Sequence, residues 1–299
     1  MGIHEQMDAM RRAHPERFLN SEAPTAAVQS DISAKLPYWP DFVRGVPNMA
    51  LRSALFSVSR QPSKPFLQRQ VIQVQKGYFI LYTGPQLSQS DLNIWEAVLH
   101  VAREQKLGTE VRFRAYQILK ALGHTDTGKN RASLELHLSR LNATALHIQA
   151  GRYGYEGSLI DEVQRDTHTR QYIIRLNAGL QSLFASHQYT HVEWDIRQAL
   201  RGKPLAQWLH GYYASHAKPF PVTVLTLHRL CGSEAAELWK FAQTLRTALH
   251  HLQKACEANS QLFSYAIQGD LVYIERQPSP SQGRHLAKRA GKAKHRSNR

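Results

Sequence analysis

The most restrictive feature of the sequence is a pattern of elements that occurs twice, with corresponding residues about 111 to 113 positions apart. Each copy begins with three large apolar residues spaced as on one helix face. Two further apolar residues then alternate as in a short strand. These residues are Leu92, Trp95, Leu99, Val111 and Phe113 in the first copy, and Leu205, Trp208, Tyr212, Val222 and Val224 in the second. The separation is too long for a solenoid and indicates two tandem modules.

Both copies continue with a short helix, a turn, a longer helix and a β-hairpin. The short helices are expected at 116–122 and 225–231, where Gly123 and Gly232 end them. This order of elements is that of a winged helix, in which a helix-turn-helix is backed by a small antiparallel sheet. The predicted fold class is therefore α+β, with two tandem winged-helix domains.

The length of 299 residues, of which 42% are hydrophobic, is sufficient for two domains with cores of their own. We expect the first winged-helix domain at 35–177 and the second at 178–276. The flanking segments, 1–34 and 277–299, are polar and charged, and we expect both to be disordered tails.

The chain is strongly basic, with a formal net charge of +15 and a pI of about 10.0. Seven Lys and Arg residues fall within 284–299, after the last acidic residue, Glu275, so +8 remains on the rest. Such charge favours a polyanionic partner, above all nucleic acid, because binding releases counterions. The alternative for the tail is a solubilising role.

Other compartments and partners are disfavoured by the sequence. It has no apolar run of transmembrane length and no basic amphipathic helix with an aromatic face, so a membrane partner is not expected. Cys231 and Cys256 are the two cysteines, which excludes a disulfide scaffold and fits a reducing cytoplasm.

The longer helix of the first module is expected to present its amino-terminal end to double-stranded DNA. Lys129 can neutralise a phosphate, and Asn130 and Arg131 carry groups that pair with adenine and guanine edges. We expect His137 and Arg140 to extend the same outward surface. The alternative interpretation is an ordinary solvated helix face.

The DNA-facing residues expected in the second module are Ser233, Lys240, Gln243, Arg246 and Thr247. Ser233 is also expected to cap this helix. Glu234 and Glu237 would repel phosphate, although a carboxylate can accept a hydrogen bond from cytosine. Trp239 borders the apolar stripe and is expected to be buried. Lys203, at another helix start, is expected to contact the DNA backbone.

A glycine-aromatic segment at 151–157 is expected to form a protruding loop of the first module. Arg152 and Tyr153 could contact the DNA backbone or minor groove there. The segment could equally be the end of a hairpin with no DNA contact, and the sequence does not decide between these interpretations.

The sequence does not favour an enzyme. It contains neither the G-x-x-x-x-G-K-[ST] phosphate loop nor the G-x-S-x-G nucleophile elbow. His191, Glu193 and Asp195 alternate along one segment and could hold a divalent ion in a relaxase or nuclease, but a solvated strand edge is the favoured interpretation. We expect no catalytic residue, metal or cofactor.

Several runs of residues resemble the TrfA-type plasmid replication initiators. The resemblance covers about residues 36–276, and the stretch 200–221 is the most specific part. The runs are Leu36-Pro37-Tyr38-Trp39-Pro40, Arg52-Ser53-Ala54-Leu55-Phe56, Tyr82-Thr83-Gly84, Gly128-Lys129-Asn130-Arg131, Leu200-Arg201-Gly202-Lys203-Pro204-Leu205-Ala206-Gln207-Trp208-Leu209-His210-Gly211-Tyr212-Tyr213, Ser215-His216-Ala217-Lys218-Pro219-Phe220-Pro221 and Leu230-Cys231-Gly232-Ser233-Glu234.

The resemblance implies a bacterial cytoplasmic protein with two winged-helix domains. Such initiators bind direct repeats (iterons) at a plasmid origin, promote local melting, and recruit the host replicative helicase and host initiator protein. It also implies a monomer–homodimer equilibrium that controls plasmid copy number. A transcriptional repressor of its own gene, using the same surfaces, is the alternative.

The same resemblance implies contact with the host sliding clamp through a glutamine-leucine-hydrophobic motif. Residues 181–184 and 86–88 match that motif only in part. We expect Leu183 and Phe184 to pack in the protein core instead.

Overall fold

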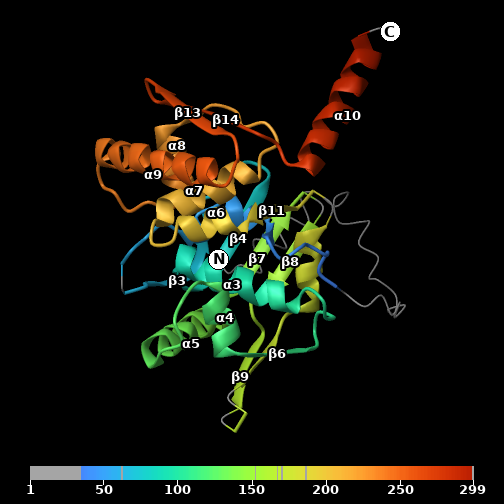
Figure 1. The fold of residues 1–299 in the computed structure, drawn as a ribbon, viewed down its shortest axis with the longest axis vertical. Helices are drawn as coiled ribbons and strands as arrows, with labels where there is room; N and C mark the ends of the chain where they lie inside the picture. Colours follow the sequence, from blue (N-terminus) through green and yellow to red (C-terminus); the bar gives the residue numbers. More distant parts are fainter. Residues whose placement is uncertain are drawn as a thin grey trace, which may run out of the picture. The chain divides into compact units, whose positions relative to one another are not determined.

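The computed structural model describes residues 35–297, apart from residues 62, 152, 167, 170 and 186. The segment 1–34, which was predicted to be disordered, therefore lies outside the described residues. The remainder consists of two repeat units, a separate sheet, and short elements that join them (Figure 1).

The first repeat unit begins at α3 and ends at β10. Its elements are α3 (Gln89–Ala102), β6 (Glu110–Arg114), α4 (Ala115–Ala121), α5 (Gly128–Asn142), β9 (Glu162–Asp166) and β10 (Gln171–Arg175). The strands form a three-stranded antiparallel sheet in the order β6-β10-β9. Ser88 and Asp91 form a capping box that starts α3, as the short polar side chains at its start favour.

The second repeat unit has the same order of these elements, without a counterpart of the two strands at 145–150 and 153–157 that follow α5 in the first unit. They are α7 (Pro204–Ala214), β12 (Val222–Thr223), α8 (Val224–Leu230), α9 (Leu238–Ala258), β13 (Phe263–Gln268) and β14 (Leu271–Arg276). Its three-stranded sheet has the order β12-β14-β13, so in both units the first strand pairs with the last. The internal repeat predicted from the sequence is therefore present in the structure.

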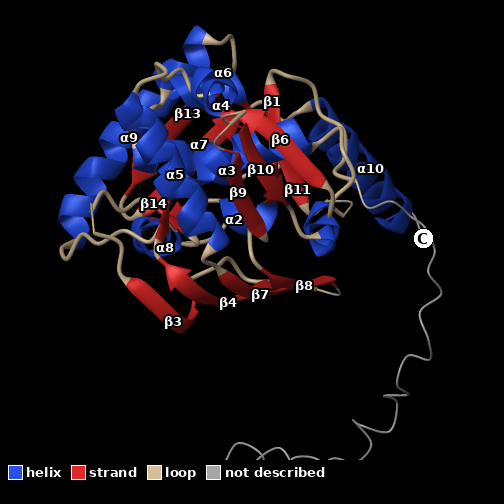
Figure 2. Ribbon diagram, turned by 90° about the horizontal axis from the view of Figure 1, so that it is seen from below, coloured by secondary structure: helices blue, strands red, loops and turns tan. Residues whose placement is uncertain are grey.

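A four-stranded antiparallel sheet lies along one side of the repeat units (Figure 2). It consists of β3 (Phe66–Val71), β4 (Tyr78–Pro85), β7 (Ala145–Ala150) and β8 (Tyr153–Gly157), in that order. The loop predicted at 151–157 is wrong over 153–157, because these residues form β8 and pair with β7. The hairpin of the first repeat unit is instead β9–β10.

Short elements connect the amino-terminal part of the described chain to the link between the units. They are β1 (Val43–Pro47), α2 (Asn48–Leu51), β2 (Phe56–Ser57), β5 (Leu87–Ser88), η2 (Ala178–Phe184), β11 (Tyr189–Glu193) and α6 (Trp194–Ala199). Strand β1 pairs with β11, and β2 pairs in parallel with β5. Residues far apart in sequence therefore meet at the start of the second repeat unit.

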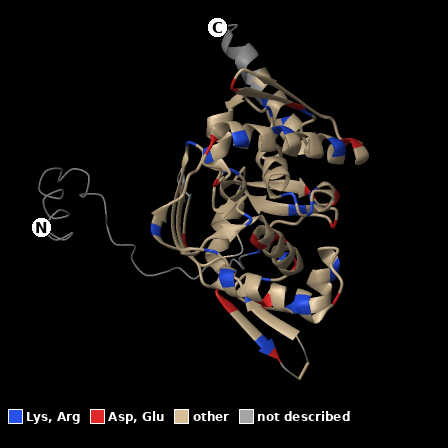
Figure 3. Cartoon of the chain, turned by 90° about the vertical axis from the view of Figure 1, so that its left-hand side faces the viewer, with Lys and Arg blue, Asp and Glu red and all other residues tan. Residues whose placement is uncertain are grey.

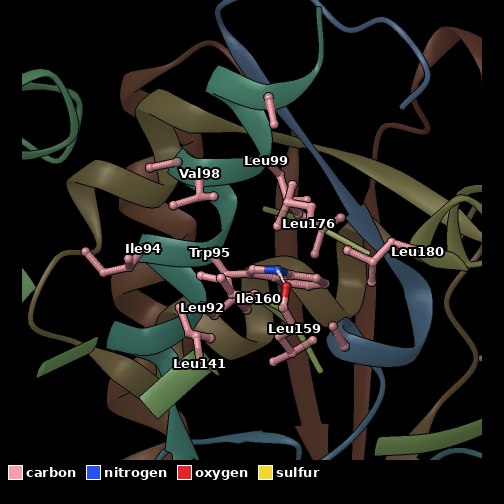
Figure 4. Packing of buried hydrophobic residues seen from close by; sticks show 14 of the residues in the cluster. Leu92, Ile94, Trp95, Val98, Leu99, Leu141, Leu159, Ile160, Leu176 and Leu180 are labelled. Atoms are coloured by element: carbon pink, nitrogen blue, oxygen red, sulfur yellow. Dashed lines mark hydrogen bonds between the residues drawn. The ribbon is translucent and has the colours of Figure 1, made fainter. Parts of the chain in front are cut away.

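Two hydrophobic cores meet at the start of α6. The first core reaches Trp194 and the second begins with Ile196, which is later than the expected domain boundary at 178. In the first core, Trp95 lies among aliphatic side chains from α3, α5 and the segments around Leu159 and Leu176 (Figure 4). Its indole N–H donates to the Leu159 carbonyl at 3.2 Å, so the buried polar group is satisfied.

A buried charge pair joins the first repeat unit to α6, the helix that precedes the second unit. Arg197 Nε, from α6, lies 2.6 Å from Glu96 Oε2 on α3, and both side chains are fully buried. The same Nε donates to Asn93 at 2.8 Å, so the contact with Glu96 is a close charge pair rather than a well-directed hydrogen bond. Burial raises the pKa of Glu96, although the charge of Arg197 opposes that shift.

The carboxyl-terminal segment is helical rather than disordered. Residues Pro280–Ser297 form α10, so the predicted disordered tail at 277–299 is wrong over this range. Its first turn is held to the second repeat unit, because Gln282 Nε2 donates to the Ala214 carbonyl at 2.8 Å and Gln282 Oε1 accepts from Arg276 Nη1 at 3.1 Å. These contacts to α7 and β14 were not apparent from the polar composition.

Candidate nucleic-acid interface

The amino-terminal end of α5 is an exposed turn with a regular cap. The Thr127 hydroxyl accepts from the Asn130 backbone N–H at 3.3 Å, and Lys129 is exposed. The Asn130 amide donates back to the Thr125 carbonyl at 2.8 Å. Lys129 therefore projects at a helix amino terminus, where backbone N–H groups and a cation both favour an anion. Asn130 must give up a loop contact before it can reach a base.

Arg131 lies beside this turn in a two-pronged pair with Asp126. Nε and Nη2 lie 2.6 and 2.7 Å from the two carboxylate oxygens. The hydrogen bond from Arg131 holds the pKa of Asp126 below its ordinary value. An exposed pair of this kind contributes little to stability, so phosphate or guanine could replace Asp126 at small cost.

His137 and Arg140 face inward, toward α3. Each places a nitrogen 2.8 Å from Asp91, and their side chains are only 15% and 13% exposed. The prediction that they extend the outward surface of α5 is wrong. The sequence did not indicate that Asp91 lies fully buried opposite them, where its uncompensated charge would be costly.

The pKa of Asp91 reflects this arrangement. Burial pushes the pKa up, but hydrogen bonds from His137 and Ser88, with the charges of His137 and Arg140, outweigh it and hold the pKa below its ordinary value. His137 and Arg140 thus stabilise the junction of α3 and α5.

The outward face of α5 consists of small residues around one large apolar side chain. Ala132, Ser133 and Ser139 are exposed, and Leu136 is 57% exposed. The sequence analysis did not identify Leu136 as an outward-facing residue. Its position off the buried face of α5, which carries Leu134 and Leu138, could have indicated this. Small neighbours allow close approach to a groove, and an aliphatic side chain can contact the thymine methyl group.

The outward face of α9 is polar and charged. Lys240, Gln243, Arg246 and Thr247 are all exposed, as predicted. The Thr247 hydroxyl donates to the Gln243 carbonyl at 3.2 Å. No described residue forms an ion pair with Lys240 or Arg246. Their charges are therefore available to a phosphate or base edge.

The start of α9 differs from the prediction. The helix begins at Leu238 with Glu237 at its N-cap, so Ser233 is not the cap. Ser233 is half-buried in the preceding turn, where its hydroxyl accepts a hydrogen bond from the Ala235 backbone N–H at 3.3 Å. Trp239 is 57% exposed, and the expectation of burial is wrong. Lys240 Nζ lies 5.3 Å from its ring centroid, a cation–π distance.

The other predicted contact residues are dispersed. Lys203 is half-buried at the N-cap of α7. Arg152 lies outside the described residues, and Tyr153 is the first residue of β8, in the four-stranded sheet rather than in a repeat unit. The structure thus brings Lys129, Asn130 and Arg131 together on α5, and Lys240 to Thr247 on α9. Figure 3 shows that Lys and Arg are spread over both repeat units, with Asp and Glu among them.

A metal centre has no site in the part of the chain that the structure describes. Within residues 35–297, leaving out the five undescribed positions, no three His, Cys, Asp or Glu side chains are grouped so that they could hold an ion. His191 is an exposed residue of β11, and partial desolvation lowers its pKa. In the same residues, no helix has both the length and the apolarity required to cross a bilayer.

Comparison with known proteins gives the family. The sequence profile of the TrfA protein family matches residues 28–276, most of the chain. The chain belongs to the TrfA family. A curated relative, "Plasmid replication initiator protein TrfA" from Escherichia coli, is 29% identical over 247 residues, which cover 80% of this chain and 63% of that protein. This TrfA family member therefore spans less than two thirds of the relative's length.

The fold also resembles a solved structure. The crystal structure of domains 2 and 3 of RctB matches with a TM-score of 0.50 at 13% identity, covering 74% of this chain and 94% of that one. A second structure of RctB domains 2–3 gives a TM-score of 0.45 at 14% identity, covering 76% and 96%. At such identity the likeness concerns the fold alone.

The partial clamp motif of this TrfA family member lies in the core. Leu183 and Phe184 are buried, and Phe184 stacks on Trp39 with ring centroids 6.0 Å apart. Leu87, in the other partial match, is fully buried. The expectation that Leu183 and Phe184 pack in the core is confirmed.

Proposed function

We propose that this chain is a plasmid replication initiator that binds duplex DNA sequence-specifically through both repeat units, each of them a winged-helix module. The observation that carries the proposal is the same order of helices and strands, with the same sheet order, in two units of one chain. In this plan the longer helix after the turn, α5 or α9, enters the major groove. Membership of the TrfA family supports replication initiation as the process served.

Two such modules on one chain suit a direct repeat. Successive major-groove faces on one side of a duplex are about 34 Å apart, so one monomer can span both. The proposed targets are iterons at the plasmid origin, in the bacterial cytoplasm. The host replicative helicase, the host initiator protein and the sliding clamp are the proposed partners, and a monomer–homodimer equilibrium is proposed to restrain copy number.

The proposed mechanism uses binding energy rather than a catalytic centre. Bending 20–30 base pairs costs about 1–6 kcal/mol by smooth elastic treatment. Protomers on adjacent repeats can share that cost and unpair a neighbouring A·T-rich segment, which is the easiest to open.

The test is a footprint of the purified chain on its own plasmid, followed by permanganate probing of the supercoiled origin. Protected direct repeats with reactive thymines beside them are expected. An α9 variant, Arg246→Ala, should lose both signals, while Lys76→Gln, in the exposed turn before β4, should keep them. Protection of a promoter without reactive thymines would favour a repressor of its own gene.

A second assay addresses the enzymatic alternative. Supercoiled plasmid incubated with the chain and magnesium or manganese should stay supercoiled. Nicking that disappears in His191→Ala or Asp195→Ala would contradict a purely binding role and favour a metal-dependent nuclease or relaxase.

A further inference from the structure

A groove with a volume of about 600 Å³ lies between α5 and the start of the second repeat unit. Its walls come from one side of α5, the first turn of α3, the end of α4, the α6–α7 turn, residues 59–61 and Lys64. The basic side chains in its lining are Arg60, Lys64, His124, His137, Arg140 and Arg201. No Asp or Glu among the described residues lines it.

The cations of this groove have few anionic partners. Arg201 Nη1 donates to the Gly123 carbonyl at 2.6 Å, Arg60 to the Gly202 carbonyl at 3.2 Å, and Lys64 to the Ser59 carbonyl at 3.3 Å. None of the three forms an ion pair with a residue in the described ranges. Backbone carbonyls orient these side chains but leave their charges uncompensated.

The acid nearest the groove is already neutralised. Asp91 is fully buried beneath the lining and is bound by His137 and Arg140. Burial lowers the pKa of Lys64, and Asp91 opposes that shift while Arg140 reinforces it. An anion in the groove would therefore face a net positive wall and would favour the charged form of Lys64.

The groove lies directly beside the proposed reading face of α5. Asn130, Ser133 and His137 line it and occupy one stripe of the helix, while Leu136 lines its rim next to the outward face. If α5 lies in a major groove, the sugar-phosphate strand bordering that groove must run along this stripe. Arg201, in the turn between α6 and α7, also lines the groove and would face the same DNA strand.

We propose that this groove binds the phosphodiester backbone of duplex DNA, in the stretch between the two major-groove sites read by α5 and α9. The proposal rests on the proposed function, since it takes α5 as the helix that enters DNA. Arg60, Lys64 and Arg201 are the phosphate contacts. Such contacts fix the position of the protein on the duplex without reading its sequence.

The experiment measures DNA affinity against salt for the full chain and for the triple variant Arg60→Gln/Lys64→Gln/Arg201→Gln. Each lost phosphate contact should reduce the slope of log affinity against log salt by about 0.9. The loss should be equal on origin repeats and on random duplex, so the ratio of the two affinities is unchanged. A matched control, Lys76→Gln/Lys106→Gln/Lys218→Gln, removes the same charge from exposed positions outside the groove and should keep a steeper slope than the triple variant.

A second measurement modifies the DNA instead of the protein. Neutral methylphosphonate linkages are placed between the two protected stretches of the repeat. The unmodified chain should lose affinity for this DNA, and the triple variant should lose much less. This arm does not depend on how well the variant folds relative to the unmodified chain, because each protein is compared with itself on two DNAs.

The outcomes separate the groove from the overall proposal. Equal salt slopes for the triple variant and the control would overturn the groove assignment. A chain that does not distinguish origin repeats from random duplex would contradict the proposed function. The slope difference on random duplex would still decide whether the groove binds backbone phosphates.

Discussion

The helices α5 and α9 occupy the same position in two repeat units with the same order of elements, yet their outward surfaces differ. On α5 two of the basic side chains are paired within the protein, Arg131 with Asp126 and Arg140 with Asp91, and only Lys129 in the first turn is exposed without an ion-pair partner among the described residues. On α9, Lys240 and Arg246 are exposed and have no ion-pair partner in the described chain. The difference teaches that a repeated fold does not imply a repeated contact.

We expect α5 and α9 to have different roles in DNA binding. Small residues around Leu136 would let α5 approach the major groove of DNA closely, and the adjacent basic groove is proposed to supply phosphate contacts. The free amide and guanidinium of Gln243 and Arg246 suit base edges. We therefore expect sequence preference to depend mainly on α9, and position on the duplex mainly on α5.

The largest expected effect is a loss of stability when the buried charge pair between α3 and α6 is broken. Arg197→Met leaves the buried carboxyl of Glu96 without its counter-charge and should lower the free energy of unfolding by about 3–5 kcal/mol. Urea unfolding of the variant measures the loss. The double variant Arg197→Met/Glu96→Leu should recover most of it, and a single variant as stable as the double would contradict this account.

Acid should weaken the second unit more than the first. Burial lowers the pKa of His216 to about 4 and of His210 to about 3 in the second unit, and of His100 to about 4 in the first. The unfolded chain takes up these protons near pH 6.5 and the native chain does not, so stability is present above pH 6.5 and falls toward pH 4. Asp91, whose pKa is depressed, loses its contribution only at lower pH.

Each histidine should contribute about 1.4 kcal/mol for each pH unit below its ordinary pKa of 6.5, which is about 2 kcal/mol between pH 6.5 and pH 5. Urea midpoints measured from neutral pH to about pH 5 should fall, and His216→Gln should flatten that fall more than an exposed control, His250→Gln. Parallel pH curves for both variants and the unmodified chain would exclude His216 as a cause.

A binding comparison sharpens the contrast between α9 and α5. Arg246→Ala should weaken binding to the origin repeat by about 1–3 kcal/mol and relax sequence preference. Arg131→Ala removes a side chain already paired with Asp126, so it should weaken repeat and random duplex more nearly equally. Titrations of both variants on both DNAs provide the measurement, and the reverse pattern would exchange the roles of the two helices.

The smallest expected effect concerns Leu136. If its side chain contacts a thymine methyl, replacing thymine by uracil in the α5 footprint should cost about 0.8 kcal/mol, the worth of one buried methylene-sized group. Leu136→Ala should lose that discrimination while Ser139→Ala keeps it. Equal sensitivity to uracil in both variants would show that α5 makes no such contact.

The sequence was most informative where periodicity and turn chemistry agree. The apolar spacing of Trp95 and Trp208, and the glycines that end the short helices, located both repeat units. The exposed residues of α9 also followed from its apolar stripe, because a long amphipathic helix with a clear core face leaves little choice for the opposite face.

The failures share a physical cause, which is pairing between residues distant in sequence. Residues 153–157 were expected in a loop, but they form β8 because they pair with β7, which in turn pairs with β4. His137 and Arg140 turn inward because Asp91 lies opposite them, and no local pattern reveals that partner. The start of α9 was also misplaced, because Ser233 bonds to its own turn instead.

The buried contact between Glu96 and Arg197 has a consequence for the DNA that this chain can recognise. Because it ties α3 to α6 in the interior, we expect it to help fix the orientation of α5 relative to α9. If the spacing between the two contacted stretches of DNA changed by half a helical turn, one stretch would face the opposite side of the duplex. The two helices could then not contact both stretches at once. The plasmid origin and this interior pair of charges are therefore expected to constrain one another during evolution.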